Sequence, residues 1–228
     1  MTEAPRPSKT GRIVALVLMG LTVFFTLAGG IGTTCVAFGA ENYESMVGLV
    51  PYKPLYQALV FISLIAGVWG IPVMRQLVRG KPNAYRNALI VLVIGAVTSG
   101  IQTVVSQSVR GKSAPVNVRF AVTLLTLIVF LIFRLPPLWR KMRFDQPLKG
   151  NSAKTAGGAV FAVCGLGTLS APLWVAQTHM EPWISGVRAP LVVAGVALTL
   201  SGVALLTLEA RSLRAKQVVL PERPAAIQ

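Results

Sequence analysis

Acidic side chains are scarce in this chain. Its 228 residues include 7 Asp and Glu against 22 Lys and Arg, and charged residues make up only 13% of the total. An ordinary soluble domain carries about 25% charged residues, whereas here 54% of the residues are hydrophobic and the mean hydropathy is +0.66. The apolar residues also arrive in long blocks. These features exclude an ordinary soluble domain and predict a polytopic membrane protein.

The side chains that usually carry catalysis are nearly missing. His179 is the single histidine, and no Asp or Glu lies within any of the long apolar runs. A buried proton relay or carboxylate-coupled transport therefore has no obvious ionisable group, and no Cys-x-x-Cys pair, Walker loop or Gly-x-Ser-x-Gly elbow is present. The one weak metal-ligand set combines His179 and Glu181 with Glu41 and Glu44 from a distant loop. We expect a non-enzymatic protein with no cofactor and no metal.

Six apolar runs predict an all-α fold. About 20 apolar residues cross a membrane, and the runs cover residues 13–36, 54–74, 87–109, 119–134, 155–180 and 189–208. The fourth run has only 14 uncharged residues between Arg119 and Arg134, so at least one arginine must lie within the helix and either snorkel or meet a partner. The predicted domains are an N-terminal segment (1–12), a bundle of six transmembrane helices (13–208) and a frayed C-terminal tail (209–228).

Positive charge is concentrated on one side of the predicted bundle. If the N-terminus is cytoplasmic, 17 of the 22 Lys and Arg lie in inner segments and five in outer ones. This bias predicts that both the N- and C-termini are cytoplasmic. No Asn-x-Ser/Thr sequon lies on an outer loop, which fits a multi-pass protein of a cell inner (plasma) membrane. Because topology explains the charge, we expect no nucleic-acid partner.

The longest and most basic of the predicted loops covers residues 134–154. It also carries Trp139, Met142 and Phe144, a combination that would let the loop lie on an anionic leaflet. A solvated loop is the alternative interpretation. The expected partners are therefore the lipid bilayer and, at its inner face, anionic lipids.

A polar stripe runs along the third apolar segment. On a helix, residues spaced three and four apart share one face, and the stripe consists of Thr98, Ser99, Gln102, Thr103 and Ser106. Arg119 begins the next helix at the same predicted outer depth. The predicted site is an outward-facing pocket for a small polar or anionic solute, bound by Thr98, Ser99, Gln102, Ser106 and Arg119.

The same residues have a purely structural interpretation. Ser, Thr and Gln side chains hydrogen-bond neighbouring membrane helices, at about 0.6 kcal/mol each. In that interpretation Arg119 forms an ion pair with Glu41, Glu44 or Glu181. Both interpretations place the stripe against protein rather than lipid.

Glycines recur at matched positions. Gly30-Ile31-Gly32-Thr33 and Gly165-Leu166-Gly167-Thr168 are related by an offset of 135 residues, and the same offset relates Gly67 to Gly202. The match suggests a parallel duplication. Small residues let membrane helices approach closely, and the expected packing glycines are Gly30, Gly32, Gly67, Gly158, Gly165, Gly167, Gly195 and Gly202. Alternatively, the paired Gly-x-Gly-Thr turns loosen two helices around a bound molecule.

For function, we expect a non-enzymatic integral membrane protein that binds or passes a small solute. In size, topology and outward pocket it is similar in outline to the substrate-binding membrane components of energy-coupling-factor vitamin transporters; the similarity is architectural, without a shared motif. One alternative is a structural or accessory subunit of a larger membrane complex. A second is an enzyme that acts on lipid head groups through the basic inner loop.

Overall fold

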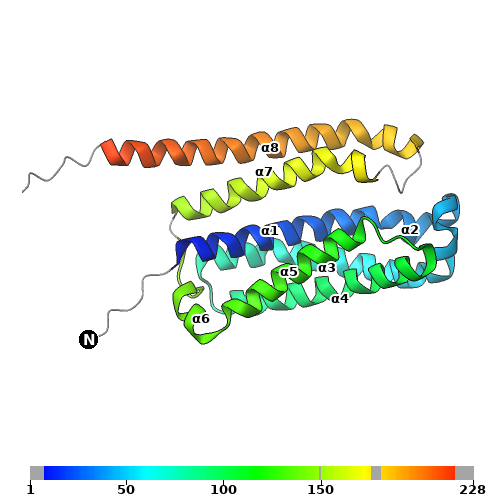
Figure 1. Ribbon diagram of the computed structural model, residues 1–228, viewed down its shortest axis with the longest axis horizontal. Helices are drawn as coiled ribbons and strands as arrows, with labels where there is room; N and C mark the ends of the chain where they lie inside the picture. Colours follow the sequence, from blue (N-terminus) through cyan, green and yellow to red (C-terminus); the bar gives the residue numbers. More distant parts are fainter. Residues whose placement is uncertain (1–7, 149, 176–180, 219–228) are drawn as a thin grey trace, which may run out of the picture.

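The computed structural model describes residues 8–148, 150–175 and 181–218, and these are helical apart from short turns. Figure 1 shows the helices as one elongated body. In chain order the elements are α1 (Lys9–Gly32), α2 (Thr34–Gly39), the 3-10 helices η1 (Ala40–Asn42) and η2 (Glu44–Tyr52), α3 (Lys53–Arg79), α4 (Ala84–Arg110), α5 (Val116–Phe133), α6 (Pro136–Met142), α7 (Gly150–Val175) and α8 (Glu181–Val218).

The prediction of an all-helical protein is confirmed for the described residues. They contain six helical stretches that are long and apolar enough to cross a membrane. A helix rises 1.5 Å per residue, so even the shortest of the six, the 18 residues of α5, extends about 27 Å. These helices indicate a multi-pass membrane protein.

Local structure differs from the prediction in the first helix. The expected helix over residues 13–36 is interrupted at Thr33, between α1 and α2. The Thr33 hydroxyl donates hydrogen bonds to the carbonyl oxygens of Gly29 (2.8 Å) and Gly30 (3.1 Å). Threonine hydroxyls that bond back to the preceding turn bend helices. The following loop also winds into η1 and η2 rather than remaining irregular.

Two further differences lie near the basic segments. The prediction of a frayed tail from Glu209 is wrong for residues 209–218, because α8 continues to Val218. Residues 209–218 are mostly good helix formers and contain no glycine or proline. Within the predicted loop 134–154, Pro136 occupies the first turn of α6, where a missing N–H costs nothing.

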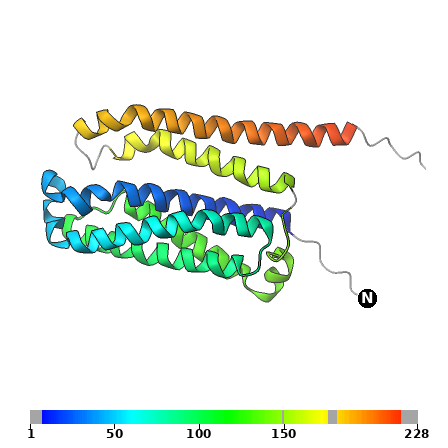
Figure 2. The same cartoon turned by 180° about the vertical axis from the view of Figure 1, so that it is seen from behind.

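The helices are arranged as a bundle with a hairpin along one side. α1 packs against α3, α5 and α7, while α4 packs against α3 and α5. α7 and α8 form the hairpin, in which α8 packs against α7 (Figures 1 and 2). The end that carries α6 and the start of α1 is called the α6 end, and the opposite end, with α2, η1 and η2, is called the α2 end. A hydrophobic cluster fills the bundle near each end.

Six of the eight expected packing glycines lie against a neighbouring helix. A Cβ atom at Gly202 would overlap the backbone nitrogen of Ala162 and lie 2.6 Å from the Gly158 carbonyl oxygen. A Cβ at Gly165 would lie 2.5 Å from the Thr199 nitrogen. The expectation does not hold for Gly32 and Gly167: no atom lies within 4 Å of a Cβ built at either. Their side of the helix is open, so their small size does not serve a close helix contact.

The glycine contacts repeat at the predicted offset. Two glycine contacts between α1 and α3 have counterparts between α7 and α8 that are 135 residues later for both partners. The contact of Gly67 with Leu27 corresponds to that of Gly202 with Ala162. The contact of Gly30 with Leu64 corresponds to that of Gly165 with Thr199. The Thr33 bond to the Gly29 carbonyl also has its counterpart, Thr168 to the Cys164 carbonyl, at 2.8 Å in both. The α7–α8 hairpin therefore reproduces these features of the packing of α1 on α3.

Candidate functional site

The polar stripe of α4 faces the interior of the bundle. Thr98 is 3% exposed, Ser106 is 5% exposed, and Ser99 and Gln102 are fully buried. Arg119 enters the same region from the first turn of α5 and is only 1% exposed. α4 and α5 pack directly on each other. The structure thus places the predicted stripe and the predicted arginine in one buried region.

The Arg119 guanidinium is held by three side chains from two helices. One of its terminal nitrogens, Nη2, donates to Ser63 Oγ at 2.7 Å and to Thr98 Oγ1 at 3.0 Å. The other, Nη1, donates to Gln102 Oε1 at 3.4 Å. The stem of Arg119 crosses α1 at Gly29, where a Cβ would lie 2.9 Å from Arg119 Cδ. We call Ser63, Thr98, Gln102 and Arg119 the arginine cluster.

The other two predicted site residues do not contact the guanidinium. Ser106 shares a 2.7 Å hydrogen bond with the hydroxyl of Tyr56, which also donates to the Gln102 carbonyl oxygen at 3.3 Å. Ser99 donates to the carbonyl oxygen of Gly95, one turn earlier in its own helix, at 2.6 Å. Ser106 therefore lies next to the cluster, while Ser99 bonds within α4.

Arg119 has no acidic partner in the part of the chain that the structure describes. Glu41 instead binds Lys53, whose Nζ lies 2.9 Å from both carboxylate oxygens. No ion pair joins Arg119 to Glu44 among the described side chains, and the side chain of Glu181 is not among them. The predicted pairing with Glu41 is therefore wrong, because Lys53 lies within reach of that carboxylate.

Two buried donors of the arginine cluster lack partners. Neither Nε of Arg119 nor Nε2 of Gln102 has a hydrogen-bond partner among the described residues. Hydrogen bonds from a charged donor contribute about 1.5–3 kcal/mol each, so the three neutral acceptors hold the guanidinium in place. They supply no counter-charge, although a charge at the centre of a membrane helix costs about 2.5–3.5 kcal/mol. The cluster thus presents a positive charge and two donor nitrogens without partners among the described residues.

The cluster is closed at both ends in this conformation. Toward the α2 end lies the hydrophobic cluster that includes Ala37, Leu49 and Val60. Toward the α6 end lies the larger cluster around Met19 and Phe130. We expected Arg119 at the mouth of an open pocket, but its 1% exposure places it inside the bundle instead. The reason is that its side chain runs inward across Gly29 toward mid-helix residues of α3 and α4.

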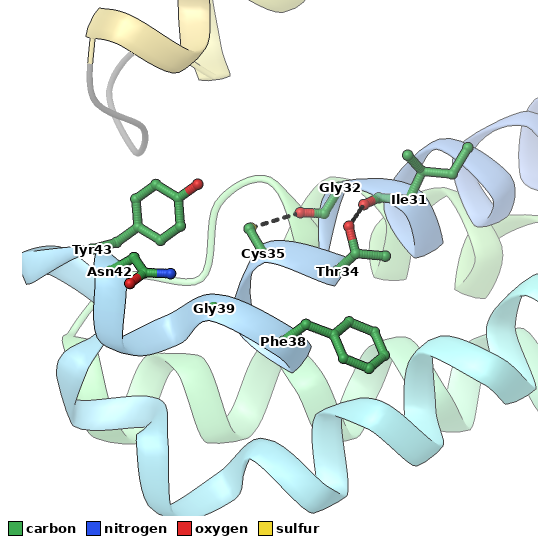
Figure 3. Close-up of a pocket in the computed structure, with 8 residues that line it drawn as sticks. All are labelled: Ile31, Gly32, Thr34, Cys35, Phe38, Gly39, Asn42 and Tyr43. Carbon is green, nitrogen blue, oxygen red and sulfur yellow. Dashed lines mark hydrogen bonds between the residues drawn. The ribbon is translucent and has the colours of Figure 1, made fainter.

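A separate hollow lies on the surface beside the α1–α2 interruption. It has a volume of about 360 Å³ and is lined by eight of the residues between Ile31 and Tyr43, among them Cys35 and Phe38 (Figure 3). Two of its polar side chains are engaged locally: Thr34 Oγ1 donates to the Ile31 carbonyl oxygen at 2.6 Å, and Cys35 Sγ donates to the Gly32 carbonyl oxygen at 3.1 Å. No charged side chain lines it. The hollow therefore offers no charged group to an ion.

Sequence reasoning missed the contribution of α3 to the site. Tyr56 and Ser63 are both buried and lie seven residues apart, so they share one face of α3. That spacing was a usable signal, because Ser63 is an isolated hydroxyl in a long apolar run. Also missed was a threonine contact between α1 and α5, in which Thr22 Oγ1 donates to Thr126 Oγ1 at 2.9 Å. It extends the buried polar region beyond the cluster toward the α6 end.

No known protein family matches this chain, and neither a curated protein nor a solved structure matches it. The outline similarity to vitamin-transporter components is thus an expectation of architecture alone. His179, the remaining candidate metal ligand, lies outside the described residues. Within residues 8–148, 150–175 and 181–218, no three His, Cys, Asp or Glu side chains are grouped as metal ligands would be. The arginine cluster is therefore the candidate site with the most specific chemistry.

Proposed function

We propose that this membrane protein binds a small anionic solute inside the α1–α5 bundle, at the arginine cluster. The observation that carries the proposal is the buried Arg119 guanidinium, which is surrounded by neutral groups and lies beside two unpartnered donors. A carboxylate or similar anion supplies both the missing counter-charge and the missing acceptors. Binding of an anion, without any chemical conversion, is enough to explain the buried guanidinium and the two unpartnered donors.

The α2 end is the proposed side of entry. At that end the chain is divided into short pieces, α2, η1 and η2, joined to α1 through the Thr33 interruption. Short helices with few internal bonds open at lower free energy than long packed ones. The bond from Gln57 Nε2 to the Ala37 carbonyl oxygen, 3.0 Å long, joins α2 to α3 and would break on opening. The solute would then reach Ser106 and Gln102 before Arg119.

Orientation is part of the proposal. The bias of basic residues favours a cytoplasmic α6 end and an outward α2 end in a cell inner membrane. In a protein without its two native cysteines, Asn42→Cys should react with an impermeant maleimide added outside intact cells. Pro147→Cys, also on the surface, should react only after permeabilisation. Labelling of position 147 in intact cells would reverse the assigned orientation.

Native mass spectrometry of protein released gently from its own membrane tests the proposed function. We expect a fraction of the protein to carry a small molecule of defined mass, which collisional activation releases as an anion. A stoichiometric companion chain without any small molecule would reject solute binding. The same spectra from Arg119→Leu provide the matched comparison, since only the buried guanidinium is removed.

A second candidate function, a subunit of a larger membrane complex, rests on the uncovered face of α8. On α3, which packs against both α1 and α4, Leu59, Ala66 and Val73 are buried. At the repeat offset of 135 residues, α8 carries Ala194, Ser201 and Leu208, and all three are exposed. α8 thus leaves open the face that is covered on α3. Small residues on that face would admit a helix of another subunit.

A further inference from the structure

A second pocket lies at the α6 end, apart from the arginine cluster. It encloses about 410 Å³ and is lined by Asn83, Tyr85, Arg86, Arg134 and Trp139. The turn before α4 contributes Asn83, the first turn of α4 contributes Tyr85 and Arg86, and Arg134 caps the end of α5. Trp139 comes from α6. Three separate elements therefore converge on one concave site.

The pocket is strongly positive. The guanidinium groups of Arg86 and Arg134 form no ion pair and no hydrogen bond with any side chain that the structure describes. Asn83 has positive φ (64°), and its side chain does not cap α4. The partial positive charge of the α4 N-terminus is thus added to two unpaired arginines. Planar guanidinium groups match phosphate oxygens well, and helix N-termini also favour phosphate.

The aromatic wall places the pocket at the surface of the membrane. The apolar stretch of α5 ends at Phe133, immediately before Arg134. Trp139 is 41% exposed, and its ring meets that of Tyr85 edge-on, with centroids 4.7 Å apart. The Tyr85 hydroxyl donates to the Phe130 carbonyl oxygen, which fixes this ring against α5. Tryptophan and tyrosine prefer the head-group level of a bilayer, so the two arginines lie where lipid phosphates lie.

We propose that this pocket binds the phosphate of an anionic phospholipid. Arg86 and Arg134 contact the phosphate oxygens, the α4 N-terminus adds its positive potential, and Trp139 packs on the glycerol and upper acyl carbons. Inorganic phosphate offers the same anionic oxygens, but it would leave the exposed Trp139 surface uncovered. The site is independent of solute binding at Arg119, because different helix ends build it.

The test uses the full-length protein in nanodiscs of phosphatidylcholine, with or without about one-fifth phosphatidylglycerol. We expect phosphatidylglycerol to raise the unfolding temperature of the wild type and to remain bound as a single adduct in native mass spectra. Arg86→Gln combined with Arg134→Gln should remove the adduct and reduce the rise by more than half. Both side chains are exposed, so the variant should unfold like the wild type in pure phosphatidylcholine.

A matched variant separates this pocket from general surface charge. Arg75→Gln combined with Arg140→Gln removes two exposed basic groups at the same end of the molecule but outside the pocket. It should keep both the adduct and the temperature rise. An equal loss in the two double variants would show diffuse attraction and overturn the proposal. It would also be overturned if inorganic phosphate stabilised the wild type in phosphatidylcholine while phosphatidylglycerol did not.

Discussion

Replacing Arg119 by leucine should greatly weaken binding of the small anion and leave the protein folded. The substitution removes the only charge of the arginine cluster, and truncating one partner of a buried charged contact costs about 2–5 kcal/mol, which corresponds to a loss of about 30-fold or more in affinity. Thr98 keeps an acceptor within its own helix, because it already donates to the Gly95 carbonyl oxygen at 3.2 Å. Anion occupancy is read from native mass spectra, and folding from the unfolding temperature.

Two controls make this result specific. Arg119→Lys keeps the charge but replaces a planar group, which here reaches three acceptors, by a compact ammonium, and we expect intermediate occupancy. Lys112→Gln removes an exposed cation near the α2 end and should bind as the wild type does. A folded Arg119→Leu protein with unchanged occupancy would mean that the cluster serves only to hold α3, α4 and α5 together.

Replacing Gly202 by leucine should separate α8 from α7. The new side chain would meet backbone atoms, the Ala162 nitrogen and, at 2.6 Å, the Gly158 carbonyl oxygen. Backbone atoms of a packed helix move only with the whole helix, so the strain is not relieved by a change of rotamer. Overpacking of this kind costs about 1–3 kcal/mol, and we expect a loss near the upper limit. Thermal or denaturant unfolding in a mild detergent measures it.

Gly167→Leu is the matched control for this prediction. Gly167 lies in the same hairpin, but no atom lies within 4 Å of a Cβ built there. Leucine also favours a helix over glycine by several tenths of a kcal/mol, so the control should be as stable as the wild type or slightly more stable. If both leucine variants lost the same stability, close packing at Gly202 would not be the cause.

The arginine cluster shows which features of a buried site the spacing of residues in the sequence can predict. The three- and four-residue spacing from Thr98 to Ser106 predicted a buried face, and the short run before Arg134 predicted that an arginine lies within a helix. Neither pattern says which helices are neighbours. That Ser63 of α3 completes the cluster depends on the packing of α3 against α4, a contact between residues far apart in the chain.

The glycines also show that sequence patterns do not identify which helices are neighbours. Gly165 and Gly167 are alike in the sequence, yet one touches the backbone of α8 and the other faces open space. Two residues along a helix differ by about 200° in direction, so only one of them can face a given neighbour. Which one does so is decided by where that neighbour lies.

The sequence by itself determined the class of the protein, its six apolar helices and the burial of one polar stripe. These follow from local rules, because hydrophobic length and helical periodicity act within single segments. Tertiary structure alone decided that Arg119 meets hydroxyls and an amide instead of Glu41, that Arg86 and Arg134 share a pocket, and that α8 keeps one face uncovered. Each of these depends on which helices pack together, and that is settled by side-chain contacts between distant parts of the chain.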